Sequence, residues 1–160
     1  MNRDQILAAL KASRAQMETA LAGLSETQLV ESGVMGEWSV KDILSHLTAW
    51  EAEVVTRLAK LKAGKKIQSI VPAGSDIDSL NAKWYKENKD RDLDRVLADF
   101  DGVREQMILQ VESMTDKQLA QPLPWAETNT IENLIAWNSY EHEPEHAEQI
   151  QKWRRDRSGA

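Results

Sequence analysis

The chain has 160 residues, a net charge of −6, 41% hydrophobic residues and no cysteine, which predicts a single soluble domain over residues 1–160. The negative charge argues against nucleic acid as the main partner, and the missing cysteines exclude disulfides and thiolate metal ligands. No apolar run approaches the roughly 20 residues of a membrane span and the start lacks an apolar signal-peptide segment, so we expect a cytoplasmic protein.

Three long amphipathic helices are predicted in the first three quarters of the chain, over residues 4–23, 40–62 and 93–114. In each segment, apolar residues recur every three or four positions, as on the buried face of a helix. Ser39 and Asp42 resemble a helix N-cap followed by an acidic partner three residues later, which places the start of the second helix. These helices and a fourth described below predict a four-helix bundle.

The link between the second and third helices is long, over residues 63–92, and contains a short predicted helix at 75–88. A helix of 20 residues is about 30 Å long, so a link of this length can cross the whole bundle. The second and third helices are therefore expected to run parallel, in an up-down-down-up topology. A weak internal repeat, LSETQL at 24–29 and MTDKQL at 114–119, predicts a short capped turn of helix after the first and third helices.

The fourth helix is predicted over residues 131–153, and one of its faces changes from apolar to polar halfway along. At about 100° per residue, that face carries Ile131, Leu134, Ile135, Asn138, His142, Glu145, His146, Gln149 and Trp153. A polar patch on a core-facing stripe needs polar partners, because burying unpaired polar groups is unfavourable.

His142 and His146 stand at positions i and i+4, which puts both rings on one side of a helix at a spacing that lets them bind one metal ion. His46 is the third histidine of the chain and lies beside the apolar stripe of the second helix. Surface or hydrogen-bonded histidines would explain the same residues without a metal, so the spacing alone leaves both explanations open.

Three further residues are candidates for a site near the histidines. Trp50, one turn from His46, is a candidate for the lining of a substrate pocket, as is Asn138 on the polar face of the fourth helix. Glu145 is a candidate general base, although a glutamate on a charged helix is usually only solvated.

Three segments carry a family resemblance: GEWSVKDILSHLTAWE at 36–51, LNAKWYKENKDRDLDRVLADF at 80–100 and NSYEHEPEHAEQIQKW at 138–153. They resemble the DinB-like superfamily, and within it the branch of four-helix bundles that includes the colibactin self-resistance protein. A histidine in the motif W-S-x-x-(D/E)-(I/V)-L-x-H is followed, in order, by H-x-x-x-H in the last helix. The resemblance covers nearly the whole chain.

The resemblance implies a divalent metal ion held by His46, His142 and His146, with one coordination position open to water or substrate. Three neutral imidazoles suit zinc, nickel or iron(II), and three protein ligands are typical of catalytic sites. The family implies a small-molecule substrate, a homodimer, and activity as a hydrolase or a thiol-dependent transferase. Two alternatives stay open: a non-catalytic bundle that binds or sequesters a small molecule, and a metal-independent hydrolase like the colibactin self-resistance protein.

The sequence departs from the family pattern between the two histidines of the last helix. Pro144 lacks an N–H, and its ring would clash with the carbonyl of Tyr140 in a continuous helix. Glu143 replaces a residue that is often aromatic in this branch. A kink at Pro144 would either turn His142 away from His146 or be absorbed with the rings still converging.

Overall fold

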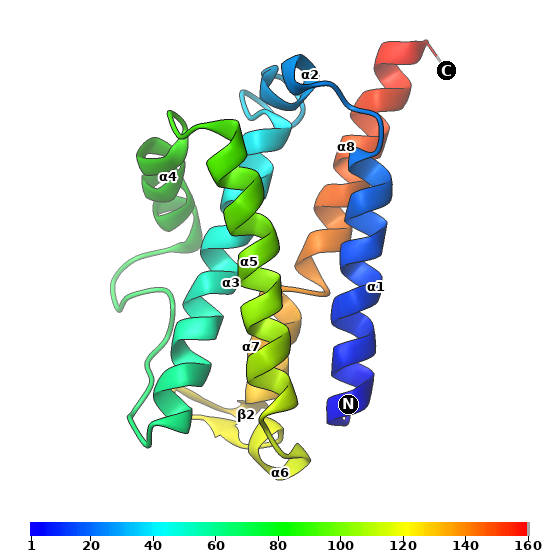
Figure 1. The fold of residues 1–160 in the computed structure, drawn as a ribbon. Coiled ribbons are helices and arrows are strands. Elements are labelled where there is room, and N and C mark those ends of the chain that lie inside the picture. The colour runs from blue at the N-terminus through cyan, green and yellow to red at the C-terminus, as the bar shows by residue number, and fades with distance from the viewer. Residues whose placement is uncertain (160) are drawn as a thin grey trace.

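The computed structural model describes residues 1–159 and contains a bundle of long helices with a small hairpin at one end (Figure 1). The elements are α1 (Arg3–Leu21), α2 (Glu26–Val30), α3 (Val40–Lys62), α4 (Ile77–Asn88), α5 (Leu93–Glu112), α6 (Asp116–Leu119), β1 (Pro122–Leu123), β2 (Ala126–Thr130), α7 (Ile131–Asn138) and α8 (His142–Ser158). The antiparallel pair β1–β2 was not predicted from the sequence.

Most helices start at a polar side chain that caps the first turn. Reciprocal capping boxes, in which the cap and the third helical residue satisfy each other's backbone N–H groups, begin five helices. The cap residues are Asn2, Ser25, Ser39, Thr115 and Thr130. The box of Ser39 and Asp42 confirms the predicted start of α3, and the short helices α2 and α6 confirm the two capped turns that the internal repeat predicted.

The helices run up-down-down-up, as predicted, because the link after α3 returns to the end at which α3 began (Figure 1). α3 and α5 are therefore parallel neighbours, and α4 in the link lies against α3. Lys41 secures the end of this link, since its Nζ donates hydrogen bonds to the carbonyl oxygens of Lys89 (2.8 Å) and Arg91 (2.9 Å). Trp50 Nε1 secures α4 itself by donating to Asn81 Oδ1 at 2.9 Å.

The prediction of one continuous helix over residues 131–153 is wrong, because the chain breaks between α7 and α8 at residues 139–141. Pro144 explains the break: within a continuous helix it would clash with the carbonyl of Tyr140. In the structure it lies in the first turn of α8, where a backbone N–H has no helical partner to lose. Glu141 N–H instead donates to Ala136 O at 3.0 Å, one residue further back than in an α-helix.

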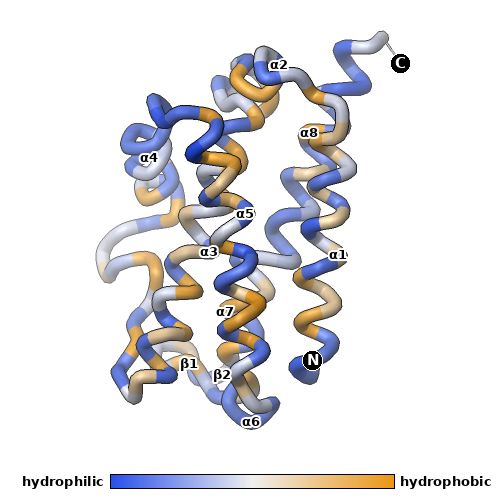
Figure 2. The backbone as a smooth tube through the Cα atoms, viewed as in Figure 1, coloured by the Kyte–Doolittle hydropathy of each residue, from blue (hydrophilic) through white to orange (hydrophobic). Residues whose placement is uncertain are grey.

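The bundle core consists of two apolar clusters with a buried polar layer between them. One cluster contains Ile6, Leu10, Val54, Leu58, Met107, Val111 and Ile135, and the other contains Met17, Leu44, Leu47, Phe100, Ala147 and Ile150. Between these positions along the four helices lie Ser13, Arg14, Glu51, Arg104 and Glu143, all buried. Hydrophobic and hydrophilic residues are interspersed along the long helices (Figure 2). Within residues 1–159, no helix has the length and apolar character that a membrane span needs.

Candidate metal centre

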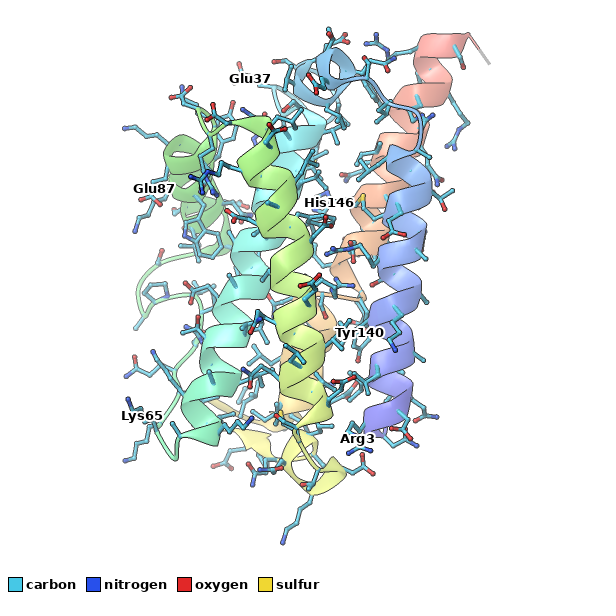
Figure 3. The ribbon with its side chains drawn as sticks, in the orientation of Figure 1. Arg3, Glu37, Lys65, Glu87, Tyr140 and His146 are labelled. Carbon is cyan, nitrogen blue, oxygen red and sulfur yellow. The ribbon has the colours of Figure 1, made fainter. Side chains whose placement is uncertain are left out.

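The three histidines converge inside the bundle, although two different helices carry them. His46 lies on α3, while His142 and His146 lie one turn apart at the start of α8. The Nε2 atom of His142 is 3.1 Å from the Nε2 atoms of both His46 and His146, and the three candidate ligand atoms lie within 4.8 Å of one another. Figure 3 labels His146 on α8, above Tyr140 at the helix break.

The break at residues 139–141 is thus compatible with convergence of the two α8 histidines. Since α8 starts at His142, both histidines belong to one unbroken helix, and the i, i+4 spacing brings their rings together. Pro144 lies between them in sequence without interrupting that helix. Of the two outcomes that the sequence left open, the structure has the one in which the rings converge.

A hydrogen bond of one outer ring nitrogen helps to orient His146. His146 Nδ1 lies 2.8 Å from Gln149 Oε1, and donation from this nitrogen leaves Nε2 with a lone pair directed at the other imidazoles. His142 Nδ1 is buried and has no hydrogen-bond partner within residues 1–159. Nitrogen atoms about 3.1 Å apart match the separation of ligands around one metal ion at bond lengths of about 2.1 Å, so the donor set fits a divalent metal.

Burial keeps all three imidazoles neutral at physiological pH. Burial and the neighbouring His142 and His146 lower the pKa of His46 to about 3. Burial and His146 lower the pKa of His142 to about 4, and burial also lowers the pKa of His146 against the opposing effect of Gln149. Neutral imidazole is the form that binds metal, so the electrostatics of the site favour ligation over protonation.

These lowered pKa values predict that the metal-free protein loses stability on mild acidification. The unfolded chain protonates its histidines near their ordinary pKa of 6.5, whereas folded His46 and His142 stay neutral down to about 3 and about 4. Between these values the unfolded state binds more protons, so the free energy of unfolding falls as the pH falls. Urea unfolding with a chelator at about pH 7.5 and about pH 5 measures this difference.

His46→Gln is the control for this prediction, since it removes one of the two imidazoles whose pKa is lowered to about 3 or about 4 and keeps a polar side chain. The variant should lose less stability than the wild type between the two pH values. Equal losses in both proteins would contradict the prediction.

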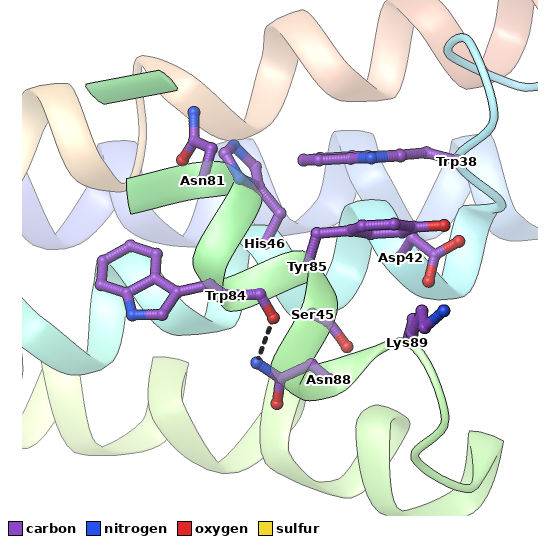
Figure 4. A pocket seen from close by; sticks show the side chains of 9 residues that line it. All are labelled: Trp38, Asp42, Ser45, His46, Asn81, Trp84, Tyr85, Asn88 and Lys89. Atoms are coloured by element: carbon purple, nitrogen blue, oxygen red, sulfur yellow. Dashed lines mark hydrogen bonds between the residues drawn. The ribbon is translucent and has the colours of Figure 1, made fainter. Parts of the chain in front are cut away.

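A narrow cavity with aromatic walls lies beside His46, between α3 and α4 (Figure 4). Trp38 lies over His46, with ring centroids 5.1 Å apart, and stacks on Tyr85 at 5.5 Å. Trp84 and Asn81 complete the α4 side of the wall. The free space between these side chains is about 10 Å³, which is enough for about one water molecule.

The other predicted site residues lie around this centre without joining it. Trp50 is buried and packs edge-on against Trp84, so it supports α4 and is not among the side chains that line the cavity beside His46. Asn138 ends α7 and donates from Nδ2 to Leu134 O at 2.7 Å. Glu145 is exposed on α8.

Sequence reasoning missed the polar layer of the core, although the sequence contains a signal for it. Charged residues occupy positions of the apolar stripes of three helices: Arg14 between Leu10 and Met17, Glu51 between Leu47 and Val54, and Arg104 between Phe100 and Met107. Such charges at spacings of three and four residues indicate buried ion pairs across a bundle. The adjacent aromatic residues Trp84 and Tyr85, in the link between α3 and α5, were the sequence signal for the wall of the cavity beside His46.

Solved structures of other proteins have the same helical fold. The colibactin self-resistance protein ClbS, solved in complex with a dsDNA, has a TM-score of 0.82 and 18% identity over 96% of this chain and 95% of that chain. The sibling lethal factor precursor DfsB has a TM-score of 0.82 and 16% identity over 98% and 97% of the two chains. An uncharacterised protein from Escherichia coli UTI89 has a TM-score of 0.80 and 19% identity over 98% and 95%.

At these identities the likeness establishes the fold, and the family follows from the sequence itself. No curated protein sequence matches the chain. The family model of the DinB superfamily matches residues 9–150, which include all three histidines, the whole of α3 and the first half of α8. The chain therefore belongs to the DinB superfamily.

Proposed function

We propose that this protein is a metal-dependent hydrolase or transferase that acts on a small reactive molecule. The observation that carries the proposal is the convergence of the Nε2 atoms of His46 and His146 on that of His142, at 3.1 Å each. Three neutral imidazoles with a fourth position open are the ligand set of catalytic zinc sites and also suit nickel or iron(II). Such an ion, when bound, supplies a Lewis acid that lowers the pKa of bound water.

The aromatic cavity gives this site a route to substrate. Trp38 lies over His46, and Tyr85 stacks on Trp38, so these rings shield the His46 side of the site from bulk water. A space of about 10 Å³ holds no substrate, so entry requires these side chains of α4 and of the segment before α3 to move apart. Asn81 and Asn88 in the wall can then donate hydrogen bonds to a polar group of the substrate.

The alternative candidate is a bundle that binds or sequesters a small molecule without metal chemistry, or a metal-independent hydrolase. The aromatic side chains around His46 could stack on a bound small molecule once they move apart, which supports the first of these. The fold shared with the colibactin self-resistance protein supports the second. That relative was solved with dsDNA. We propose a small molecule as the partner of this chain because its net charge of −6 opposes binding to phosphate backbones.

Metal analysis of protein purified without an affinity tag tests the proposal. We expect one equivalent of metal per chain after exposure to zinc, nickel or iron(II), followed by removal of the free ion. Activity toward reactive esters and thiol conjugates should then require the metal and disappear in a His142→Asn variant. Wild-type protein that retains no stoichiometric metal would refute the metal centre, and metal-independent turnover would favour the second alternative.

A further inference from the structure

The first turn of α8 carries His142 and leads directly into His146 one turn later, yet little apolar packing holds it. Three residues separate it from the end of α7, and the side chain of its N-cap residue Glu141 makes no capping hydrogen bond. Within this turn, Glu145 is exposed and His142 and Pro144 are partly exposed. Glu143 is the buried residue of the turn, with 1% of its surface exposed.

The carboxylate of Glu143 is bound by side chains of two other helices, and Glu143 is not among the residues that line the cavity. Its Oε1 accepts a hydrogen bond from Arg14 Nε of α1 at 2.8 Å. Its Oε2 accepts from Arg104 Nη2 of α5 at 2.6 Å and from Ser13 Oγ of α1 at 3.1 Å. These three donors fix both oxygens, so the position of Glu143 is defined relative to α1 and α5.

Arg104 extends the connection to α3, the helix of His46. Its Nε and Nη2 donate to the two oxygens of Glu51 at 2.7 and 3.2 Å, which is a bidentate pair. Glu51 follows His46 by five residues on the same helix. A continuous chain of buried ion pairs therefore joins the helix of His46 to the turn of His142.

Ion pairs of this kind restrict the position of a helix more strongly than apolar contacts do. An apolar face can slide or rotate slightly with small cost, whereas a buried carboxylate loses its hydrogen bonds if its helix turns or shifts. Buried charges therefore favour one register of the packed helices. For α8, that register is the one in which His142 and His146 face His46.

We propose that Glu143 is a positioning residue whose ion pairs with Arg14 and Arg104 fix the rotation and height of the first turn of α8, and thereby direct His142 and His146 at His46. The inference rests on the proposed metal centre for its significance, but the geometry that it describes belongs to the metal-free protein. Glu143 itself contacts neither metal nor substrate in this assignment.

The test is Glu143→Gln, which keeps the shape of the side chain and removes its charge. We expect zinc affinity, measured by competition with a chelator, to fall about 10- to 100-fold, as for other residues that orient metal ligands. The visible absorption spectrum of the Co²⁺-loaded variant should also change, because the ligand geometry changes. Val111→Ala is the control. It removes buried methyl groups from α5 in the apolar cluster that contains Leu10 and Met107. This variant should keep the zinc affinity and the Co²⁺ spectrum of the wild type.

A readout without metal separates failure of this inference from failure of the metal centre. In metal-free protein, ¹H–¹⁵N spectra of the histidine side chains report the tautomer and surroundings of each ring. Glu143→Gln should shift the signals of His142 and His146, whereas Val111→Ala should not. If Glu143→Gln does not fold, Ser13→Ala removes one of the three donors and should produce smaller changes in the same direction. Wild-type histidine signals in a folded Glu143→Gln protein would overturn the proposal, whether or not the wild type binds metal.

Discussion

Replacing His46 with Ala is expected to weaken zinc binding by more than the roughly 100-fold that loss of an outer-shell partner causes, because it removes a ligand outright. The two histidines of α8 would remain as a pair, but His46 is the ligand that ties α3 to α8. The helical fold should persist, since His46 lies beside the apolar stripe of α3 and is only partly buried. Zinc competition titrations and circular dichroism measure the two effects separately.

Thr48→Ala is the matched control for this substitution. Thr48 lies two residues from His46 on α3, is also partly buried, and donates from Oγ1 to Leu44 O within its own helix. This variant should bind zinc as the wild type does. Equal affinity in the His46→Ala and wild-type proteins would show that His46 is not a ligand.

Replacing Arg104 with Met is expected to lower the free energy of unfolding by about 3–5 kcal/mol, the usual cost of removing one partner of a buried ion pair. Arg104 is 3% exposed and binds both Glu51 and Glu143, which are 2% and 1% exposed. Without it, Arg14 is the remaining cation that contacts Glu143, and Glu51 loses its ion pair. Urea unfolding at neutral pH measures the loss.

The loss should be smaller in acid. Burial raises the pKa of Glu51 above its ordinary value even beside Arg104, which opposes the shift. Without Arg104 the folded state binds a proton at Glu51 more readily than the unfolded state does, so stability falls as the pH rises through this range. The difference in the free energy of unfolding between variant and wild type should therefore be smaller in acidic buffer than in alkaline buffer.

Arg95→Met provides the comparison on the same helix. Arg95 is exposed, and exposed substitutions usually change stability by no more than about 0.5 kcal/mol. If Arg104→Met were no more destabilising than Arg95→Met, the buried ion pairs would not contribute as we infer. A triple variant that adds Glu51→Gln and Glu143→Gln to Arg104→Met should recover part of the loss, because no unpaired charge remains.

Local features of the sequence were enough to place the helices. Apolar spacing predicted α1, α3 and α5 to within about two residues at each end, which is the usual scatter of helix boundaries. The capping pair Ser39 and Asp42 placed the start of α3, and the length of the link predicted that α3 and α5 are parallel. Each of these features depends on residues close together in the chain, so a pattern along the sequence reveals it.

The histidine centre was predictable in part for the same reason. His142 and His146 are one turn apart, and the i, i+4 spacing brings their rings together wherever a helix forms. The family resemblance added His46. The break at residues 139–141 did not prevent this, because both histidines lie on the same side of it.

The sequence by itself determined the four-helix bundle, its topology and the three histidines that meet in it. The tertiary structure decided where α8 begins, which side chains close the cavity beside His46, and which partners the buried charges find. Glu143 shows the physical reason: its neighbours in sequence do not indicate that its carboxylate meets Arg14 and Arg104, 129 and 39 residues away. Such contacts depend on the rotation and relative height of packed helices, and these are set by all the helices together.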